Sequence, residues 1–183
     1  WLDRQPQYAP VALNPDDIRA SFDHQITDEA DLHRHLRVTA NQWFAQIIRA
    51  EFEQNQSLEI IGAALSEVAA AAVDTALSYY RPQLAERFGD PTDDQGNPVG
   101  LCALGMGKLG GWELNLSSDI DLIFVHEIDG ETTGRKSTTF EDFFARLIKK
   151  VTPALDTLTG FGRVFQVDLR LRPWGSAGPT SIS

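Results

Sequence analysis

The spacing of apolar side chains changes partway along this chain, and that change constrains the fold more than any other feature. Up to residue 88 the apolar residues recur every three or four positions, the period of an amphipathic α-helix. Beyond residue 99 they alternate or form short runs, as in β-strands. Residues 89–98, between these parts, are rich in turn-forming side chains. The pattern therefore predicts an α+β chain.

The first part, residues 1–98, is predicted to be helical. Asn14 followed by Pro15 and two acids is typical of a helix start. Two longer helices are predicted over residues 29–54 and 58–88, each with one apolar stripe. We expect these two helices to pack against each other as a hairpin, or against the domain that follows.

The second part, residues 99–183, is predicted to be a mixed sheet with covering helices. Strands are predicted over residues 99–104, 119–126 and 164–171, and a helix with one apolar face over residues 140–158. The apolar face of that helix is expected to belong to the core. Because the chain starts at a residue other than Met and stops within a continuing segment, we expect a fragment whose second domain is truncated at the C-terminus.

Composition narrows the functional classes. A formal net charge of −10 argues against binding nucleic acid along its phosphates, since proteins that do so carry a basic face. A membrane span and a secretory signal are not expected either. The single cysteine, Cys102, cannot form an intramolecular disulfide, and its apolar neighbours predict that it is buried. A reducing, cytoplasmic location is therefore expected.

A glycine-rich turn, residues 105–111, follows the first predicted strand. Repeated glycine lets backbone amides turn inward and bind an anion. A P-loop would need Ser or Thr after Lys108, where Leu109 stands. A dinucleotide-binding crossover needs about a dozen residues or more, and the short segment before Asp119 is too short for one. An anion-binding turn is favoured, and a tight turn without a ligand remains the alternative.

Two acids, Asp119 and Asp121, open the second predicted strand. Residues two apart on a strand point to the same face, with Cα atoms about 6–7 Å apart, so both side chains can reach one cation. The remaining residues of this strand are apolar, which predicts burial of both faces along most of its length. Like charges this close are costly without a cation, and oxygen ligands suit Mg²⁺. Solvated acids at an exposed strand end remain the alternative.

The third predicted strand, residues 164–171, alternates strictly between apolar and polar side chains. Its polar face, extended by one residue, carries Asp168, Arg170 and Arg172. Asp168 would complete a second metal site, as two-metal phosphoryl transfer requires, and the arginines would clamp phosphate oxygens. The alternative is that Asp168 simply pairs with an arginine.

The order of strand, glycine turn, Asp-x-Asp strand and later Asp strand resembles the DNA polymerase β nucleotidyltransferase superfamily. Within it, the chain most closely resembles the glutamine synthetase adenylyltransferase and adenylyl-removing enzyme family. The segments that carry this resemblance are GMGKLGGWELNLSSDIDLIF at residues 105–124, VDLRLRPWG at 167–175 and SAGP at 176–179. The signature that they form spans about residues 101–183 and is highly specific.

The resemblance implies roles for particular residues. Asp119, Asp121 and Asp168 would be the catalytic acids and would hold Mg²⁺. The glycine turn and the serines before Asp119 would take nucleotide phosphate. With the two arginines, the residues expected to bind nucleotide or phosphate are Gly107, Lys108, Gly110, Gly111, Ser117, Ser118, Arg170 and Arg172.

Enzymes of this family carry two such domains, one attaching AMP to a tyrosine of glutamine synthetase and one removing it by phosphorolysis to give ADP. The helix pair and the connector over residues 86–96 resemble the N-terminal, adenylyl-removing half. We therefore expect Mg²⁺-dependent AMP removal that regulates nitrogen assimilation, with glutamine synthetase, ADP or ATP, and phosphate as ligands. A PII signalling protein is expected as a partner of the full-length chain. ATP-dependent adenylylation, or a catalytically silent nucleotide-binding regulatory domain, is the alternative.

Overall fold

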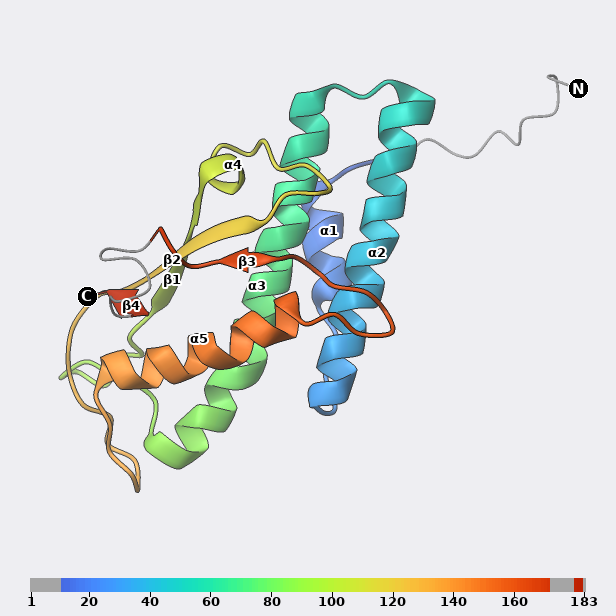
Figure 1. Cartoon of the computed structure of the whole chain (residues 1–183). Coiled ribbons are helices and arrows are strands. Elements are labelled where there is room, and N and C mark those ends of the chain that lie inside the picture. Colours follow the sequence, from blue (N-terminus) through green and yellow to red (C-terminus); the bar gives the residue numbers. More distant parts are fainter. Residues whose placement is uncertain (1–10, 172–179, 183) are drawn as a thin grey trace, which may run out of the picture.

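The computed structural model describes residues 11–171 and 180–182. In the described chain a helical part is followed by a small mixed sheet with helices packed against it, so the α+β prediction is confirmed (Figure 1). In chain order the elements are α1 (Pro15–Phe22), α2 (Glu29–Gln54), α3 (Leu58–Phe88), β1 (Leu101–Met106), α4 (Gly107–Gly110), β2 (Ile120–His126), α5 (Phe140–Asp156), β3 (Val167–Asp168) and β4 (Ser181–Ile182).

Side-chain caps set where the helices begin and end. Asn14 accepts a hydrogen bond from the backbone N–H of Asp16 at 3.0 Å, which starts α1 as predicted. Asp28 caps α2 in the same way through the N–H of Asp31 at 2.8 Å. Asn55 ends α2 in the left-handed conformation, with φ of 50°. Both long helices have the predicted bounds and pack against each other.

Helix α3 runs through the centre of the molecule, in contact with α1, α2 and α5 (Figure 1). Many of its buried residues are alanines, which allow neighbouring helices to approach closely. By length and composition alone α3 could cross a membrane, but 67% of its apolar window is buried inside the structure, as in a core helix. Buried residues before and after residue 98 form one continuous core.

Strand β2 is the centre of the sheet. It pairs antiparallel with β1 and parallel with β3 and β4. Since β1 covers the full length of β2, the two short strands lie along the other edge of β2. The antiparallel β1–β2 connection confirms that the glycine turn does not open a parallel dinucleotide-binding crossover. Strand β1 begins and ends two residues later than predicted, and α5 ends two residues earlier.

Two burial predictions are wrong. Strand β2 is buried on one face only, with alternating buried and half-buried residues, and Cys102 on β1 is exposed. Helix α3 lies behind one face of the sheet, where Ala103 and Leu122 share a cavity with Val73 of that helix. The opposite face is more open, and Leu104 there is 42% exposed. Apolar residues in a strand do not by themselves show how many faces are covered.

The third strand is much shorter than predicted. Its ladder contains only Val167–Asp168, and Leu171 is 53% exposed instead of lying on an apolar strand face. Val164 and Phe165 are neighbours yet both buried, and their N–H groups donate to the carbonyl of Leu155 at 3.1 and 3.3 Å. This segment therefore wraps around the end of α5 before it joins the sheet.

Arg37 of α2 is fully buried and joins the helical part to the segment that leads into β3. Its guanidinium donates to carbonyl oxygens of Ala154 at 2.9 Å, Thr157 at 2.5 Å and Gly162 at 2.9 Å, and to that of His33 in its own helix. The carbonyls of Ala154, Thr157 and Gly162 lie at the end of α5 and in the following turn. One side chain thus donates to four backbone carbonyls, and the carbonyl of Gly162 also accepts from the N–H and the hydroxyl of Thr159.

We predict that Arg37→Ala lowers the free energy of unfolding by about 3 kcal/mol, because buried carbonyls then lack donors and a cavity remains. Arg34→Ala on the same helix is the control. Arg34 is exposed and pairs only with a neighbouring acid, so its loss should change stability by less than about 0.5 kcal/mol. Urea unfolding measures both values. Equal effects of the two substitutions would contradict the role given to Arg37.

Candidate active site

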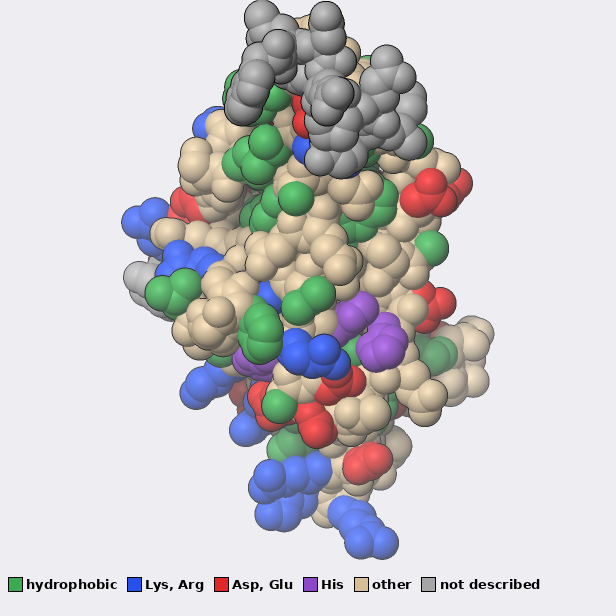
Figure 2. Space-filling view, turned by 90° about the vertical axis from the view of Figure 1, so that its right-hand side faces the viewer, with side chains coloured by type: hydrophobic (Ala, Val, Ile, Leu, Met, Phe, Trp, Pro, Cys, Tyr) green, Lys and Arg blue, Asp and Glu red, His purple; other side chains and the backbone are tan. Residues whose placement is uncertain are grey.

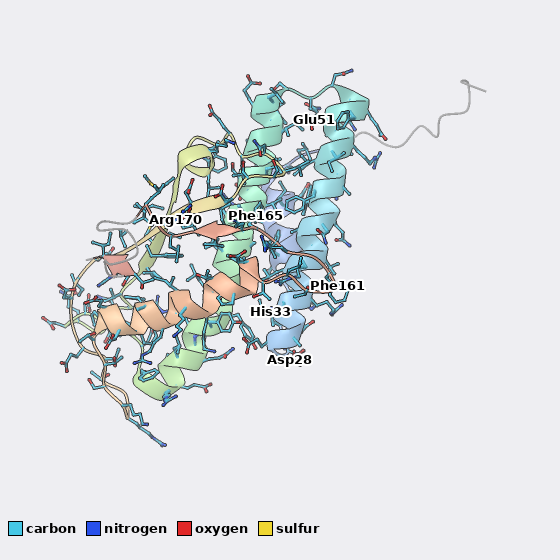
Figure 3. All side chains as sticks on the ribbon, viewed as in Figure 1. Asp28, His33, Glu51, Phe161, Phe165 and Arg170 are labelled. Carbon is cyan, nitrogen blue, oxygen red and sulfur yellow. The ribbon has the colours of Figure 1, made fainter. Side chains whose placement is uncertain are left out.

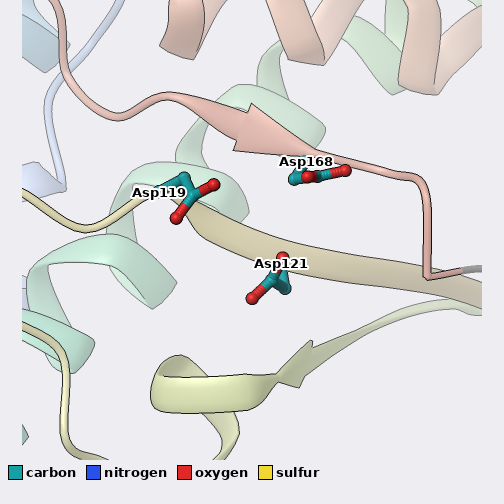
Figure 4. A group of neighbouring side chains, drawn as sticks. All are labelled: Asp119, Asp121 and Asp168. Carbon is teal, nitrogen blue, oxygen red and sulfur yellow. The ribbon is translucent and has the colours of Figure 1, made fainter.

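Three carboxylates converge at the start of β2. Asp119 immediately precedes β2, Asp121 lies on it, and Asp168 lies on the neighbouring strand β3 (Figure 4). Asp121 and Asp168 are direct partners in the parallel register, and one ligand oxygen from each of the three acids lies within 4.8 Å of the others. The prediction that these strands are neighbours and that their acids meet is confirmed.

The local sequence explains this convergence. Ile120, between the two acids, is fully buried, so its neighbours Asp119 and Asp121 turn the other way. The N–H of Ile120 donates to the carbonyl of Gln166 at 2.8 Å, which joins the two strands just before Asp168. A buried apolar anchor and one backbone hydrogen bond therefore set the spacing of the acids.

The charges of the three acids are unevenly compensated. Partial burial and the nearby charges of Asp119 and Asp168 raise the pKa of Asp121 above its ordinary value. Hydrogen bonds from Arg170 instead lower the pKa of Asp168. The charged form of Asp121 is thus disfavoured in the folded protein, whereas that of Asp168 has a cationic partner.

Arg170 does not lie where the strand prediction placed it. The chain turns after Asp168, so that the backbone N–H of Arg170 donates to Asp168 Oδ1 at 2.8 Å. Its guanidinium donates to both oxygens of the same carboxylate, with Nε 2.8 Å and Nη2 2.5 Å from Oδ2. Arg170 therefore contacts Asp168 directly instead of standing beside it on an extended strand, and it lies just beyond β3 (Figure 3). Arg172 lies outside the described residues.

The glycine turn closes one side of the acid cluster. Gly107 has φ of +53°, and a Cβ atom there would lie 2.7 Å from Asp121 Oδ2, so a larger residue could not leave this carboxylate in place. At Gly110 a Cβ would come within 2.5 Å of the carbonyl of Gly105. The N–H of Gly111 donates to the carbonyl of Gly107 at 3.1 Å, so it already has a partner inside the turn.

The lysine and serines predicted to bind phosphate also come together. Lys108 Nζ lies 3.5 Å from the hydroxyl of Ser118. Asn115 accepts hydrogen bonds from Ser118 at 2.7 Å and from Ser117 at 3.3 Å. Asn115, which holds both serines in this way, was not among the predicted site residues. An asparagine followed by serines two and three positions later is the signal that could have revealed this side-chain turn.

A cavity of about 590 Å³ adjoins these serines. It lies between the beginning of α3 and the segment after the glycine turn, and Ser117 is part of its lining. Gly62 of α3 allows this segment to come close, because a Cβ there would lie 2.8 Å from the carbonyl of Trp112. Carboxylates at its rim include Glu51 near the end of α2 (Figure 3). The cavity is large enough for a nucleoside.

The acid cluster offers the donor set of a hard cation. All three side chains supply oxygen, and burial together with the neighbouring carboxylates raises the pKa of Asp121. Mg²⁺ prefers such oxygen ligands and is commonly held by one or two carboxylates together with substrate phosphates. Asp119, Asp121 and Asp168 could therefore hold a divalent cation beside a phosphate group.

A model of the glutamate-ammonia ligase adenylyltransferase family matches residues 2–183. Three similar proteins are each named bifunctional glutamine synthetase adenylyltransferase/adenylyl-removing enzyme. The Thioalkalivibrio sulfidiphilus protein is 43% identical over 83% of this chain and 16% of its own length. Those of Mannheimia succiniciproducens and Shewanella oneidensis are 38% and 40% identical over the whole chain and 20% of their length. The chain belongs to this family of nucleotidyltransferases, and it spans about a fifth of the length of such relatives.

The opposite pKa shifts of two acids predict opposite effects on stability. Because the pKa of Asp121 is raised, protonated Asp121 stabilises the folded state at pH values below the ordinary pKa of an aspartate. This stabilisation is lost as the pH rises through the raised pKa. Asp121→Asn should therefore raise the melting temperature at pH 7, by about 2–4 °C at most in a chelated sample, and the gain should vanish near pH 3.

Asp168→Asn is the matched control. The lowered pKa of Asp168 stabilises the fold above the ordinary aspartate pKa and is lost on acidification, so this substitution should lower the melting temperature at pH 7. Thermal melts from pH 3 to pH 8 give both curves. The electrostatic description of the site fails if Asp121→Asn destabilises the protein at pH 7.

Proposed function

We propose that this chain is the catalytic core of an adenylyl-removing enzyme that cleaves AMP from a tyrosine of glutamine synthetase by Mg²⁺-dependent phosphorolysis. The main support is the meeting of three carboxylates, within 4.8 Å, with the exposed guanidinium of Arg170. Acids of this kind hold divalent cations, and a guanidinium beside them suits a phosphate nucleophile. The relatives are named for two activities, adenylyl transfer and adenylyl removal, and such a site suits either one.

The proposed reaction exchanges a phosphate ester bond for a phosphoanhydride bond at a single phosphorus atom. An oxygen of inorganic phosphate attacks the phosphorus of the tyrosyl-bound AMP and forms a P–O–P bond. The bond from that phosphorus to the tyrosyl oxygen breaks, and the tyrosyl oxygen takes up a proton. The products are ADP and unmodified tyrosine, with no change in oxidation state.

The chain's own residues have distinct parts in this scheme. Asp119, Asp121 and Asp168 would hold Mg²⁺, which supplies positive charge to the attacking and leaving oxygens. The short turn at Gly107 allows the nucleotide to approach Asp121 without a side chain between them. Lys108 and Ser118, whose side chains lie 3.5 Å apart, would contact the AMP phosphate. Most of the catalytic benefit would come from positioning and charge, as in other phosphoryl transfers.

The wider setting of this activity is part of the proposal. Glutamine synthetase would be the protein substrate, phosphate and ADP the small ligands, and a PII signalling protein a partner of the full-length protein in the cytoplasm. The helix pair α2–α3 and the connector after it, which resemble the adenylyl-removing half of the family, favour removal of AMP over its attachment. Adenylylation would use ATP at the same carboxylates, so the direction must be measured.

Asp119→Asn should reduce turnover by a factor of about 10³ or more, because it removes one cation ligand while keeping the shape of the side chain. Asp94→Asn, in the exposed loop before β1, is the control and should retain the wild-type rate. The assay is release of the nucleotide from adenylylated glutamine synthetase. Normal turnover by Asp119→Asn would exclude this carboxylate from catalysis.

The direction of reaction is tested by the nucleotide that appears. With adenylylated glutamine synthetase and Mg²⁺, we expect ADP, and only when phosphate is added. Labelled phosphate should enter the terminal position of the ADP, since it supplies the attacking oxygen. AMP release without phosphate would instead indicate hydrolysis. Pyrophosphate formation from ATP with unmodified glutamine synthetase as the substrate would indicate adenylylation.

A further inference from the structure

We infer that Arg170 moves between Asp168 and a substrate phosphate, and that this movement makes the binding of phosphate and of a divalent cation mutually reinforcing. The inference rests on the proposed function, because it concerns the same carboxylates. It adds that one exposed side chain controls access of the cation to Asp168.

Arg170 occupies the carboxylate of Asp168. An ionised carboxylate has about four lone-pair directions. At Asp168, Oδ1 accepts from the backbone N–H of Arg170 at 2.8 Å and Oδ2 accepts from Nη2 at 2.5 Å, while the single Nε–H is shared between them, with Nε 3.0 Å from Oδ1 and 2.8 Å from Oδ2. A cation that coordinates Oδ2, or both oxygens together, must therefore displace guanidinium donors. Arg170 and the cation compete for the same oxygens.

The second argument is the difference between the two side chains. Asp168 is only 12% exposed and stays anchored by its place in β3, whereas the Arg170 side chain is 81% exposed. The guanidinium can thus leave while the backbone N–H of Arg170 continues to hold Oδ1. Departure would free Oδ2 without disturbing the direction of the carboxylate.

The third argument is charge. The positive charge of Arg170 also acts on Asp119 and Asp121, so it lowers the attraction of the whole cluster for a cation. A phosphate offers the same guanidinium a bidentate partner of equal or greater charge. Once Arg170 turns to the phosphate, its charge no longer opposes the cation at Asp168. Linkage then requires the converse, that the cation strengthens phosphate binding by the same factor.

Binding of Mn²⁺ tests this sequence without any turnover. Free Mn²⁺ is measured by electron paramagnetic resonance, which corrects for metal bound by phosphate in solution. Wild type, Arg170→Ala, Arg170→Lys and the control Arg163→Ala are compared with and without inorganic phosphate. Arg163 is also exposed but pairs with Asp156, the last residue of α5.

Without phosphate, Arg170→Ala should bind Mn²⁺ on the order of tenfold more tightly than wild type, within the usual range of coupling between sites. Phosphate should tighten Mn²⁺ binding to wild type and to Arg163→Ala by a similar factor, and hardly at all to Arg170→Ala. Arg170→Lys keeps the charge but loses the fork, so its response to phosphate should also be small.

The sign of the first effect separates this inference from a supporting role. If Arg170 only oriented Asp168, its loss would weaken Mn²⁺ binding, and that result would overturn the inference. Equal tightening by phosphate in wild type and Arg170→Ala would do so as well. If wild type bound no more Mn²⁺ than Asp121→Asn, the cation site and with it the proposed function would fail. Normal Mn²⁺ binding without an effect of Arg170 refutes the coupling alone.

Discussion

Repulsion among three carboxylates is the constraint around which the site is built. Oxygens within 4.8 Å of one another cannot all be charged without cost, and burial together with the charges of Asp119 and Asp168 raises the pKa of Asp121. The protein meets this cost with ordinary packing. Ile120 is fully buried between two of the acids, and β1 and β3 hold β2 from both edges. Burial of apolar residues thus keeps together charges that would otherwise separate.

The acid on β3 depends on the helical part as well as on the sheet. Two residues are not enough to make a strand stable by itself. The path into β3 is held by Arg37 at the turn after α5, then by two N–H bonds to Leu155, and finally by the bond between Ile120 and Gln166. Since Arg37 belongs to α2, the helix pair sets the position of Asp168. The two parts of the chain are therefore mechanically connected at the site.

Periodicity predicted the helices well and the last strand poorly, for a physical reason. Helix α2 is long, capped and amphipathic, and α3 is a long apolar helix that is buried on most sides, so local signals and packing agree. In residues 164–171 the alternation is real, but Val164 and Phe165 pack on α5 and the chain turns at Arg170 to bind Asp168. The motif spacing revealed the three acids. The sequence contained no signal that Arg37 would bind carbonyls more than a hundred residues away.

Charge also decides where a phosphate could approach the acids. The chain has a net charge of −10, and the three carboxylates add a local field that repels phosphate. A phosphate can therefore approach only where that field is cancelled nearby, by a cation at the carboxylates and by guanidinium or ammonium groups at the rim. Lys108 and Arg170 stand at two sides of the cluster, on the glycine turn and after β3. Since Arg170 already binds one of the acids, we expect the attraction of the site for phosphate and its attraction for a cation to be coupled.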